Sequence, residues 1–369
     1  MNQAVIGLGF GDEGKGLVVD YLASRRPESI NVRFSGGHQV GHTVVSKDAG
    51  FRHVFSNFGS GAFRGLSTYW SRNCTVCPIG LVNELEDLRS KGLEPKIRID
   101  RECALVTPME RESNRDEEKK RQHGSCGVGF GATVQREEDY FSLRFMDIFY
   151  PEILEARLQN IRKYYHGPSP WKESDMHSFR ECCKTIASDS AVSMGSYMPM
   201  NEGIFEGSQG LMLDQRYGFF PNVTRSNTGT KNISDVVDNT EFYLVTRAYQ
   251  TRHGNGFMTN EDLSHNIKVD KDETNVLNEY QGEFRRSLLD VSLLEYALNI
   301  DDGIRTRPKL NLVITCLDHV ENDYRFTYKG EVVACCDEEE FVDKVSRILG
   351  VFSVYVSRSS DSANIEKVK

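Results

Sequence analysis

The 369-residue sequence lacks the features of membrane-spanning, exported and nucleic-acid-coating proteins. No apolar run approaches the roughly 20 residues of a membrane span, and no N-terminal signal peptide is visible, so we expect a cytoplasmic protein. Positive charge is not in excess, because 45 Lys and Arg stand against 54 Asp and Glu, a net charge of -9. A general nucleic-acid-binding surface is therefore not expected.

Cysteine pairs at metal-binding spacing are also missing. Cys74 and Cys77 form one C-x-x-C pair among the nine Cys, but no second pair follows at zinc spacing. The pairs at 182–183 and 335–336 are adjacent residues. We interpret the cysteines as reduced thiols and predict no structural metal.

The hydrophobic content (38%) and charged content (27%) are those of a folded globular protein. A strand pattern at residues 3–8, a helical pattern at 15–26 and a second strand at 30–34 predict a βαβ unit with parallel strands. The other predicted elements are strands at 203–206, 241–248 and 310–315, and helices at 81–91, 110–122 and within 151–190.

These elements predict an α/β fold, with a predominantly parallel central sheet flanked by helices and a P-loop-like phosphate-binding turn. We find no linker, so we expect one domain over residues 1–369 with helical insertions at about 80–122 and 151–190. The glycine-rich residues 123–134 are expected to interrupt the helical pattern.

Residues 9–16 read GFGDEGKG and connect the first predicted strand to the helix. The spacing Gly9-x4-Gly14-Lys15 is that of a P-loop, in which backbone N–H groups and a helix N-terminus bind phosphate. Gly16 stands where a P-loop has the Ser or Thr that binds Mg²⁺. Asp12 and Glu13 would oppose phosphate binding unless they bind a metal or take part in the reaction. The alternative role for Asp12 is to cap the helix.

Residues 35–43 read SGGHQVGHT and follow the second predicted strand. Glycines, histidines and a hydroxyl at a strand end indicate a second phosphate-contacting loop. A structural role is expected for His38. His42 lies between Gly41 and Thr43, and we interpret it as catalytic, because a cation or donor there can neutralise charge on a transferring phosphoryl group.

These two loops and four later segments resemble the adenylosuccinate synthetase family. Residues 9–16 and 36–43 are similar to the family patterns WGDEGKG and GGxNAGHT. The later similarities are FEGSQG at 205–210 to FEGAQG, FPNVTRSNT at 220–228 to YPYVTSSNT, YQTRHGNG at 249–256 to STRVGAGP, and TCLD at 315–318 to TKLD. The resemblance spans residues 3 to about 362 and so covers nearly the whole chain.

The resemblance implies a carbon–nitrogen ligase that joins L-aspartate to C6 of a 6-oxopurine nucleotide. An NTP phosphorylates O6, and the amino group of aspartate then displaces that phosphate. By resemblance, Asp12 takes the proton from purine N1 and binds Mg²⁺ together with the Gly41 carbonyl. His42 stabilises the developing oxyanion, and Gln209 is the third predicted catalytic residue. The implied partners are a purine monophosphate, GTP or ATP, and L-aspartate, with no nucleic acid or membrane, in a homodimer.

The same resemblance assigns binding residues to each substrate. The triphosphate would be held by Gly11, Glu13, Gly14, Lys15, Gly16, Gly41 and Thr43. The substrate nucleotide would be held by Gln39, Ser125, Cys126, Gln209 and Thr224. Aspartate would be held by Thr251, Arg252 and Arg285, and the base of the energy donor by Asp318 and Ser357.

Several positions depart from the family pattern. In GSCGVGFG at 124–131, similar to TTGRGIGP, a Thr that contacts the substrate 5′-phosphate becomes Cys126 and an Arg becomes Val128. In the segment 280–286, similar to TTGRRRR, the first Arg, associated with aspartate and the ribose 2′-hydroxyl, becomes Glu283. Cys316 replaces the Lys of the guanine element. An Arg that the neighbouring subunit lends has no match, although Arg136 and Arg144 lie near the position in sequence.

These changes fall on ribose, phosphate and aspartate contacts, and the chain is shorter than the usual bacterial member. We therefore favour dGMP as substrate, giving N6-succino-2-amino-2′-deoxyadenylate as in a related viral branch, which would place the protein in a host cytoplasm. Intact Asp12 argues against this branch, where Ser often replaces it. The alternative is IMP with GTP in AMP biosynthesis.

Two further functions stay open. The third hypothesis is an inactive nucleotide-binding paralogue, which the retained Asp12 and His42 disfavour. A different P-loop phosphotransferase or GTPase is disfavoured by Gly16. Asp318 favours a guanine nucleotide as energy donor, whereas Cys316 leaves ATP open.

Overall fold

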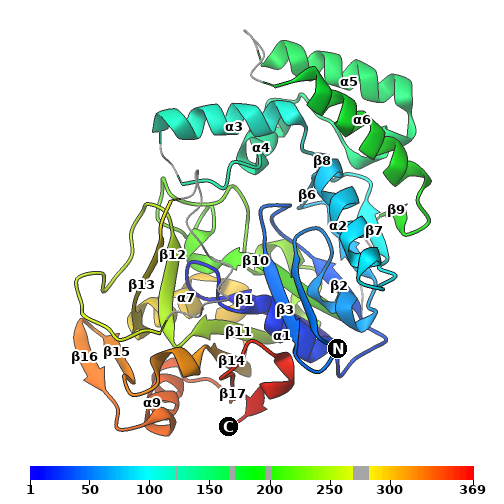
Figure 1. The fold of residues 1–369 in the computed structure, drawn as a ribbon. Helices are drawn as coiled ribbons and strands as arrows, with labels where there is room; N and C mark the ends of the chain where they lie inside the picture. The colour runs from blue at the N-terminus through cyan, green and yellow to red at the C-terminus, as the bar shows by residue number, and fades with distance from the viewer. Residues whose placement is uncertain (122–123, 166–170, 197–201, 269–281) are drawn as a thin grey trace.

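The computed structural model describes residues 1–121, 124–165, 171–196, 202–268 and 282–369. A ten-stranded sheet forms the centre of the molecule (Figure 1). All of its paired strands are parallel except the last pair, β17 and β18. In spatial order the strands are β18 (Glu366–Lys367), β17 (Ser353–Val356), β14 (Leu310–Thr315), β11 (Thr240–Arg247), β1 (Asn2–Gly7), β10 (Gly203–Gly210), β2 (Ile30–Arg33), β5 (Thr68–Trp70), β7 (Ile97–Asp100) and β9 (Val192–Gly195).

Both faces of the central strands are buried, because side chains along β1 alternate between two hydrophobic clusters. Ala4 and Ile6 pack in the cluster that includes α7 (Val291–Ile300) and α9 (Glu338–Leu349). Val5 packs in the cluster that includes α1 (Lys15–Ala23). This period of two explains why parallel strands covered by helices on both sides read as continuous apolar runs.

A third hydrophobic cluster joins the β5–β7 end of the sheet to helices α2 (Pro78–Ser90), α5 (Pro151–Tyr164) and α6 (Glu173–Ser188). Helices α3 (Pro108–Arg121) and α4 (Phe130–Glu138) lie beside them, at the top of Figure 1. Short α8 (Asp302–Arg305) follows α7.

Three smaller sheets complete the fold of the described residues. The four-stranded sheet contains β12 (Tyr249–His253), β13 (Phe284–Asp290), β15 (Arg325–Tyr328) and β16 (Glu331–Ala334). The two-stranded sheets are β3 (His42–Ser46) with β4 (Phe51–Phe55), and β6 (Thr75–Val76) with β8 (Ala104–Leu105).

The predicted α/β fold with a mostly parallel sheet flanked by helices is confirmed. One local expectation needs correction, because the region 80–122 is not purely helical and contains β7 and β8. Residues 124–129 are not helical, as expected of the glycine-rich region, and α4 begins at Phe130. The polar turn at 167–170 lies outside the described residues. The single-domain organisation stays a prediction.

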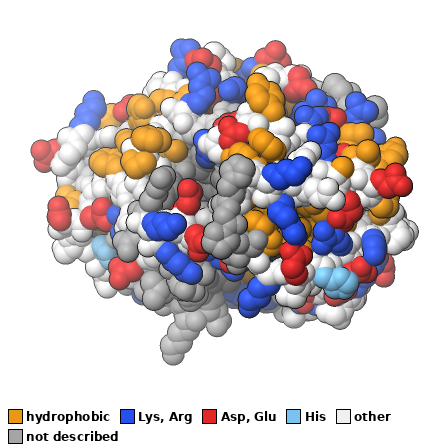
Figure 2. Space-filling view, turned by 90° about the horizontal axis from the view of Figure 1, so that it is seen from above, with side chains coloured by type: hydrophobic (Ala, Val, Ile, Leu, Met, Phe, Trp, Pro, Cys, Tyr) orange, Lys and Arg blue, Asp and Glu red, His pale blue; other side chains and the backbone are white. Residues whose placement is uncertain are grey.

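Two further observations concern the surface charge and the presence of membrane-spanning helices. Figure 2 shows acidic and basic side chains intermingled on the face seen from above, without a large field of one sign. In the part of the chain that is described, no helix has the length and apolar character to cross a bilayer.

Candidate active site

A cavity of about 1380 Å³ lies at the carboxyl ends of the central strands. Its walls include the loop after β1, Gln209 near the end of β10, and the last residues of β11 and β14, Arg247 and Thr315. Ligands of open α/β sheets bind at this edge. The predicted site residues that line the cavity are Gly11, Asp12, Glu13, Gly14, Lys15, Gly16, Gln39, Gly41, His42, Thr43, Ser125, Cys126, Gln209, Thr224, Arg252 and Asp318.

The loop at residues 9–16 is held in shape by side chains from three strands. The carbonyl of Gly11 accepts a hydrogen bond from Thr251 Oγ1 at 3.1 Å, and the carbonyl of Glu13 accepts one from Thr315 Oγ1 at 2.8 Å. Arg247 Nε donates to the carbonyl of Asp12. These three hydrogen bonds tie the backbone of the loop to the neighbouring strands.

Asp12 adopts an uncommon backbone conformation in this loop, with φ of 56°. Its side chain is 26% exposed, lines the cavity, and has Oδ2 3.4 Å from His253 Nε2. The N-cap of α1 is Gly14, and no described side chain caps it. The alternative that Asp12 caps the helix is therefore wrong.

Glu13 and Lys15 form a buried pair within the loop. Lys15 Nζ lies 3.5 Å from Glu13 Oε2, and the N–H of Gly9 donates to Glu13 Oε1 at 2.5 Å. Burial raises the pKa of Glu13, while the Lys15 ammonium and the Gly9 N–H oppose that rise. The carboxylate of Glu13 thus ties the first residue of the loop to the lysine that is expected to face phosphate.

His42 is oriented by a carboxylate that the list of predicted site residues omitted. Its Nδ1 lies 2.5 Å from Glu206 Oε1, so Nδ1–H faces Glu206, and Nε2 is 3.4 Å from the carbonyl of Ser208. Ser60 donates to Glu206 from both its N–H (3.0 Å) and its Oγ (2.5 Å). Although burial opposes it, contact with His42, together with Arg33 and Ser60, lowers the pKa of Glu206 to about 2.

Glu206 is therefore an ionised acceptor that fixes the tautomer and ring orientation of His42. The signal was present in the sequence, because Glu206 lies in the FEGSQG segment. The structure was needed to show that Glu206 contacts His42, because the two residues are 164 positions apart in the sequence.

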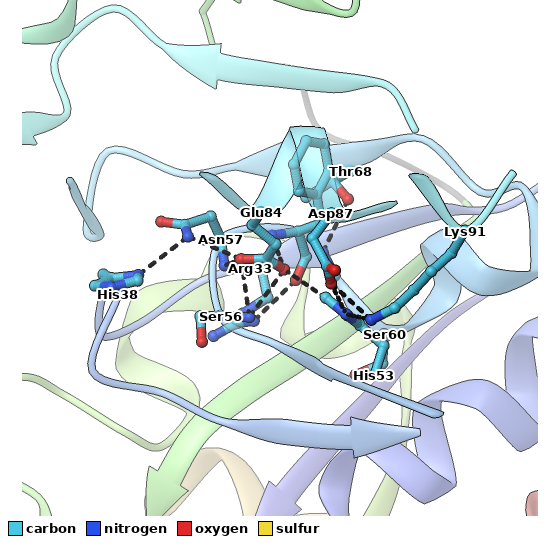
Figure 3. A network of polar contacts seen from close by, with 12 residues as sticks. Arg33, His38, His53, Ser56, Asn57, Ser60, Thr68, Glu84, Asp87 and Lys91 are labelled. Carbon is cyan, nitrogen blue, oxygen red and sulfur yellow. Dashed lines mark hydrogen bonds and ion pairs between the residues drawn. The ribbon is translucent and has the colours of Figure 1, made fainter. Parts of the chain in front are cut away.

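A second polar network supports Ser60 (Figure 3). Glu84 on α2 accepts hydrogen bonds from the N–H of Ser56 (3.0 Å) and from the N–H (2.6 Å) and side-chain amide (2.8 Å) of Asn57. His38 Nδ1 is 3.0 Å from the same Asn57 amide nitrogen, and its pKa is lowered by burial. This network fixes the turn that precedes Ser60.

Asp12 and Gly41, which both line the cavity, carry a carboxylate and a carbonyl oxygen, the ligand types that Mg²⁺ takes. Within the described residues, no group of three or more His, Cys, Asp or Glu side chains could enclose a metal. The Asp12 carboxylate and the Gly41 carbonyl instead both line the open cavity. Mg²⁺ typically takes one or two protein oxygens and completes its shell with water and substrate phosphates.

A further glycine-rich loop, residues 124–131, is held by side chains of α3. Asn114 Nδ2 donates to Ser125 Oγ at 2.9 Å, and Asn114 Oδ1 accepts from the N–H of Gly129 at 3.2 Å. Glu118 accepts from the N–H of Gly124 at 2.9 Å. Burial raises the pKa of Cys126 to about 11, so its thiol is neutral at ordinary pH.

Two predicted nucleotide contacts differ in their present partners. Both amide atoms of Gln39 are buried at the cavity wall, with no hydrogen-bond partner among the described residues. Such an amide is available to a ligand that both donates and accepts. Gln209, by contrast, accepts from Ser208 Oγ at 2.7 Å.

Arg252 presents a buried guanidinium at the cavity wall. Its Nη1 donates to the carbonyl of Phe257 (2.6 Å) and its Nη2 to that of Asn222 (2.8 Å), whereas Nε has no partner in the described part of the chain. Burial and the neighbouring Arg285 lower its pKa to about 10. An incompletely paired buried guanidinium suits a carboxylate ligand.

Three predicted residues do not line the large cavity. Thr251 binds the Gly11 carbonyl from behind the loop. Arg285 donates to Glu261 at 2.6 Å and to the carbonyl of Gly256 at 2.9 Å. Ser357 is buried and donates to the carbonyl of Ser359, while Ser359 and Ser360 reach the wall beside Asp318.

The two candidate replacements for the missing Arg are already engaged. Arg136 is fully buried and contacts Glu110 at 2.7 Å and Glu137 at 2.6 Å. Arg144 is 43% exposed and is paired with Glu102. Arg136 therefore stabilises the α3–α4 region and is not accessible to a neighbouring subunit.

Comparison with known proteins gives a consistent result. A family model described as "Adenylosuccinate synthetase" matches residues 4–363. The adenylosuccinate synthetase of Thermoplasma acidophilum is 30% identical over 324 residues, covering 81% of this chain and 73% of that protein. That of Halobacterium salinarum is 29% identical over 371 residues, covering 90% and 82%.

Two solved structures share the fold. One is a fully ligated adenylosuccinate synthetase from Plasmodium falciparum, with a TM-score of 0.78, 16% identity and 99% of each chain covered. The other is the succinoaminodeoxyadenylate synthetase of cyanophage S-2L, bound to dGMP and to dATP as an energy donor. It has a TM-score of 0.63 and 14% identity, covering 99% of this chain and 95% of that chain.

Proposed function

The chain belongs to the adenylosuccinate synthetase family of carbon–nitrogen ligases, and on this premise we propose that it joins L-aspartate to C6 of IMP with hydrolysis of GTP. The observation that carries the proposal is the Asp12 carboxylate, held by a phosphate-type loop in a cavity that also contains His42 oriented by Glu206. The curated relatives at 30% and 29% identity are named adenylosuccinate synthetases, which favours IMP over the dGMP preferred from sequence.

In the proposed first step, Asp12 accepts the N1 proton of the purine. The electron pair of the N1–H bond moves into the ring, O6 becomes nucleophilic, and O6 attacks the γ-phosphorus while the bond to the β-phosphate oxygen breaks. The reaction yields GDP and a 6-phosphoryl nucleotide. A carboxylate in contact with the substrate is suited to this transfer, because general-base catalysis typically contributes about 10²- to 10⁴-fold.

As the imidazolium, with Nδ1–H on Glu206, His42 would donate from Nε2 to the oxygen that develops charge. Burial lowers the pKa of His42, and the contact with Glu206 opposes that fall. Lys15 and the amides of residues 9–16 would bind the triphosphate. Asp12 and Gly41 would hold Mg²⁺, which neutralises phosphate charge when bound.

In the proposed second step, the amino group of aspartate attacks C6 and inorganic phosphate leaves. Arg252 would bind an aspartate carboxylate with its guanidinium. Asp318 and the adjacent residues Ser359 and Ser360 would contact the base of the energy donor.

A second candidate substrate is dGMP, with ATP or GTP as donor. It is favoured by two substitutions at the cavity wall, where Cys126 and Val128 replace the hydroxyl and the guanidinium of the family pattern. It is also favoured by Glu283, an acidic residue in place of an Arg. Asp12 serves both substrates equally, because IMP and dGMP each carry a proton on N1.

The test is a substrate panel. The purified protein is incubated with L-aspartate, Mg²⁺ and GTP or ATP, and IMP, dIMP, GMP and dGMP are offered singly and then in competition. We expect succinylated product and phosphate release with IMP and GTP. Product from dGMP at a higher kcat/KM would establish the second candidate, and nucleotide binding without turnover of any substrate would establish the inactive paralogue.

A further inference from the structure

His253 contacts the proposed catalytic base without having a role in the steps above. It stands where the related STRVGAGP pattern has Val. Its Nε2 lies 3.4 Å from Asp12 Oδ2, and its side chain is 12% exposed at the cavity wall. A polar ring in place of an aliphatic side chain, beside the carboxylate, requires an explanation.

Strand β12 contacts two consecutive residues of the loop through alternate side chains. Thr251 donates to the Gly11 carbonyl at 3.1 Å, and His253, two residues further along the same face, reaches the Asp12 carboxylate. Arg247 donates to the carbonyl of Asp12. The backbone and the carboxylate of Asp12 are therefore both contacted by side chains of neighbouring strands.

The His253 ring is itself held in place. It pairs across the antiparallel ladder with Phe284 of β13, and the two ring centroids are 4.6 Å apart. Arg247 and Arg286 both lie over the Phe284 ring, at 5.6 Å and 4.7 Å from its centroid. A ring packed in this way can orient the group that it contacts.

We propose that His253 is a positioning residue for Asp12, and this proposal rests on the proposed function. Its Nε2–H fixes the rotamer of the Asp12 carboxylate by holding Oδ2, so that Oδ1 stays directed to the N1 proton of the purine. An unrestrained carboxylate samples several staggered rotamers. Proton transfer needs a heavy-atom distance of about 2.6–3.2 Å, and such contacts are often longer before substrate binds.

The main experiment compares His253→Leu with His253→Gln. The two replacements have similar volume, but only Gln keeps an N–H donor. For His253→Leu we expect kcat to fall about 10- to 30-fold, since small errors in position cost up to about 10²-fold. The KM values for IMP, GTP and aspartate should change less than about twofold, because binding groups are untouched. His253→Gln should recover most of kcat.

The matched control is His177→Leu, on the exposed surface of α6, which should leave kcat unchanged. A step-specific readout is the exchange of the β,γ-bridge oxygen of GTP, measured with IMP but without aspartate. Since Asp12 accepts the N1 proton in the first step, before aspartate reacts, this exchange should slow in parallel with kcat in His253→Leu.

A double-mutant comparison separates the two levels of the argument. In an Asp12→Asn background, adding His253→Leu should have no further effect, because the group to be positioned is gone. Wild-type kcat in His253→Leu, or equal losses in the Leu and Gln variants, would overturn the positioning role alone. Wild-type turnover in Asp12→Asn would instead remove the proposed base, and with it the premise.

Discussion

Among the loops that line the cavity, residues 9–16 (the first loop) and residues 124–131 (the second loop) are supported in different ways. The loop at residues 9–16 is held by Arg247, Thr251 and Thr315, from strands β11, β12 and β14. The loop at residues 124–131 is held by side chains of one helix, α3, among them Asn114 and Glu118.

The two loops also differ in how closely they follow the family pattern. The first keeps the GDEGKG residues, whereas the second replaces a hydroxyl and a guanidinium with Cys126 and Val128. Residues fixed by several strands cannot shift independently of the sheet, while a loop resting on one helix can accept changes that only that helix must accommodate. We infer that the first loop determines the reaction type and that the second loop influences which nucleotide is bound as substrate.

The largest expected effect comes from breaking the chemistry of the first loop. Asp12→Asn keeps the size of the side chain but removes the basic oxygen. We expect kcat to fall about 10³-fold, which is within the usual contribution of a general base. The KM for IMP should change far less, because the second loop is intact. Steady-state kinetics with all three substrates would measure this, and a loss expressed only in KM would contradict the division between the loops.

The next effect tests the support of His42. Glu206→Gln removes the ionised acceptor of Nδ1–H, so the ring loses its fixed tautomer. We expect kcat to fall about 10²-fold, in line with the cost of mutating an orienting partner. Glu331→Gln, on the exposed strand β16, is the control and should behave as the unchanged protein. An unchanged kcat in Glu206→Gln would show that His42 acts without its carboxylate.

The same contrast explains what the sequence could predict. Residues 9–16 and 36–43 act close to their own strands, so local spacing was enough to identify Asp12, Lys15 and His42 as cavity residues. Long-range partners were not accessible, because Glu206 is 164 residues from His42 and Thr251 is 240 residues from Gly11. The βαβ pattern was sufficient to predict the central sheet. Strands β7 and β8 were not predicted, because they are short and lie between two helical patterns.

A third prediction loosens the second loop through Asn114, which lines the cavity but is not one of the predicted substrate contacts. Asn114→Ala removes the hydrogen bonds to Ser125 Oγ and to the N–H of Gly129. We expect the KM for the monophosphate to rise about 10-fold, since each lost bond costs roughly 0.5–1.5 kcal/mol. The kcat at saturating substrate should stay within about twofold, because the first loop is unchanged.

Lys119→Ala, exposed on the same helix, controls for a general effect on α3. A fall in kcat for Asn114→Ala with an unchanged KM would show that the second loop takes part in the chemistry, and the proposed division would then fail.

The smallest expected effect comes from restoring a hydroxyl that the family pattern has and this chain lacks. Cys126→Thr places a hydroxyl in the second loop at the cavity wall, where it can donate to a phosphate oxygen. One added hydrogen bond is worth about 0.5–1.5 kcal/mol, so we expect the KM for IMP to fall roughly two- to tenfold.

The pH dependence of this difference in KM also follows, because a Cys126 thiolate would repel the phosphate and raise the wild-type KM. Since burial raises the pKa of Cys126 to about 11, the thiol stays neutral through the assay range. The ratio of wild-type to Cys126→Thr KM should therefore stay constant from about pH 7 to pH 9, two units below that pKa. A ratio that grows with pH would contradict this expectation and indicate a Cys126 thiolate near the phosphate. An unchanged KM for IMP together with a lower KM for dGMP would indicate that Cys126 faces a deoxyribonucleotide.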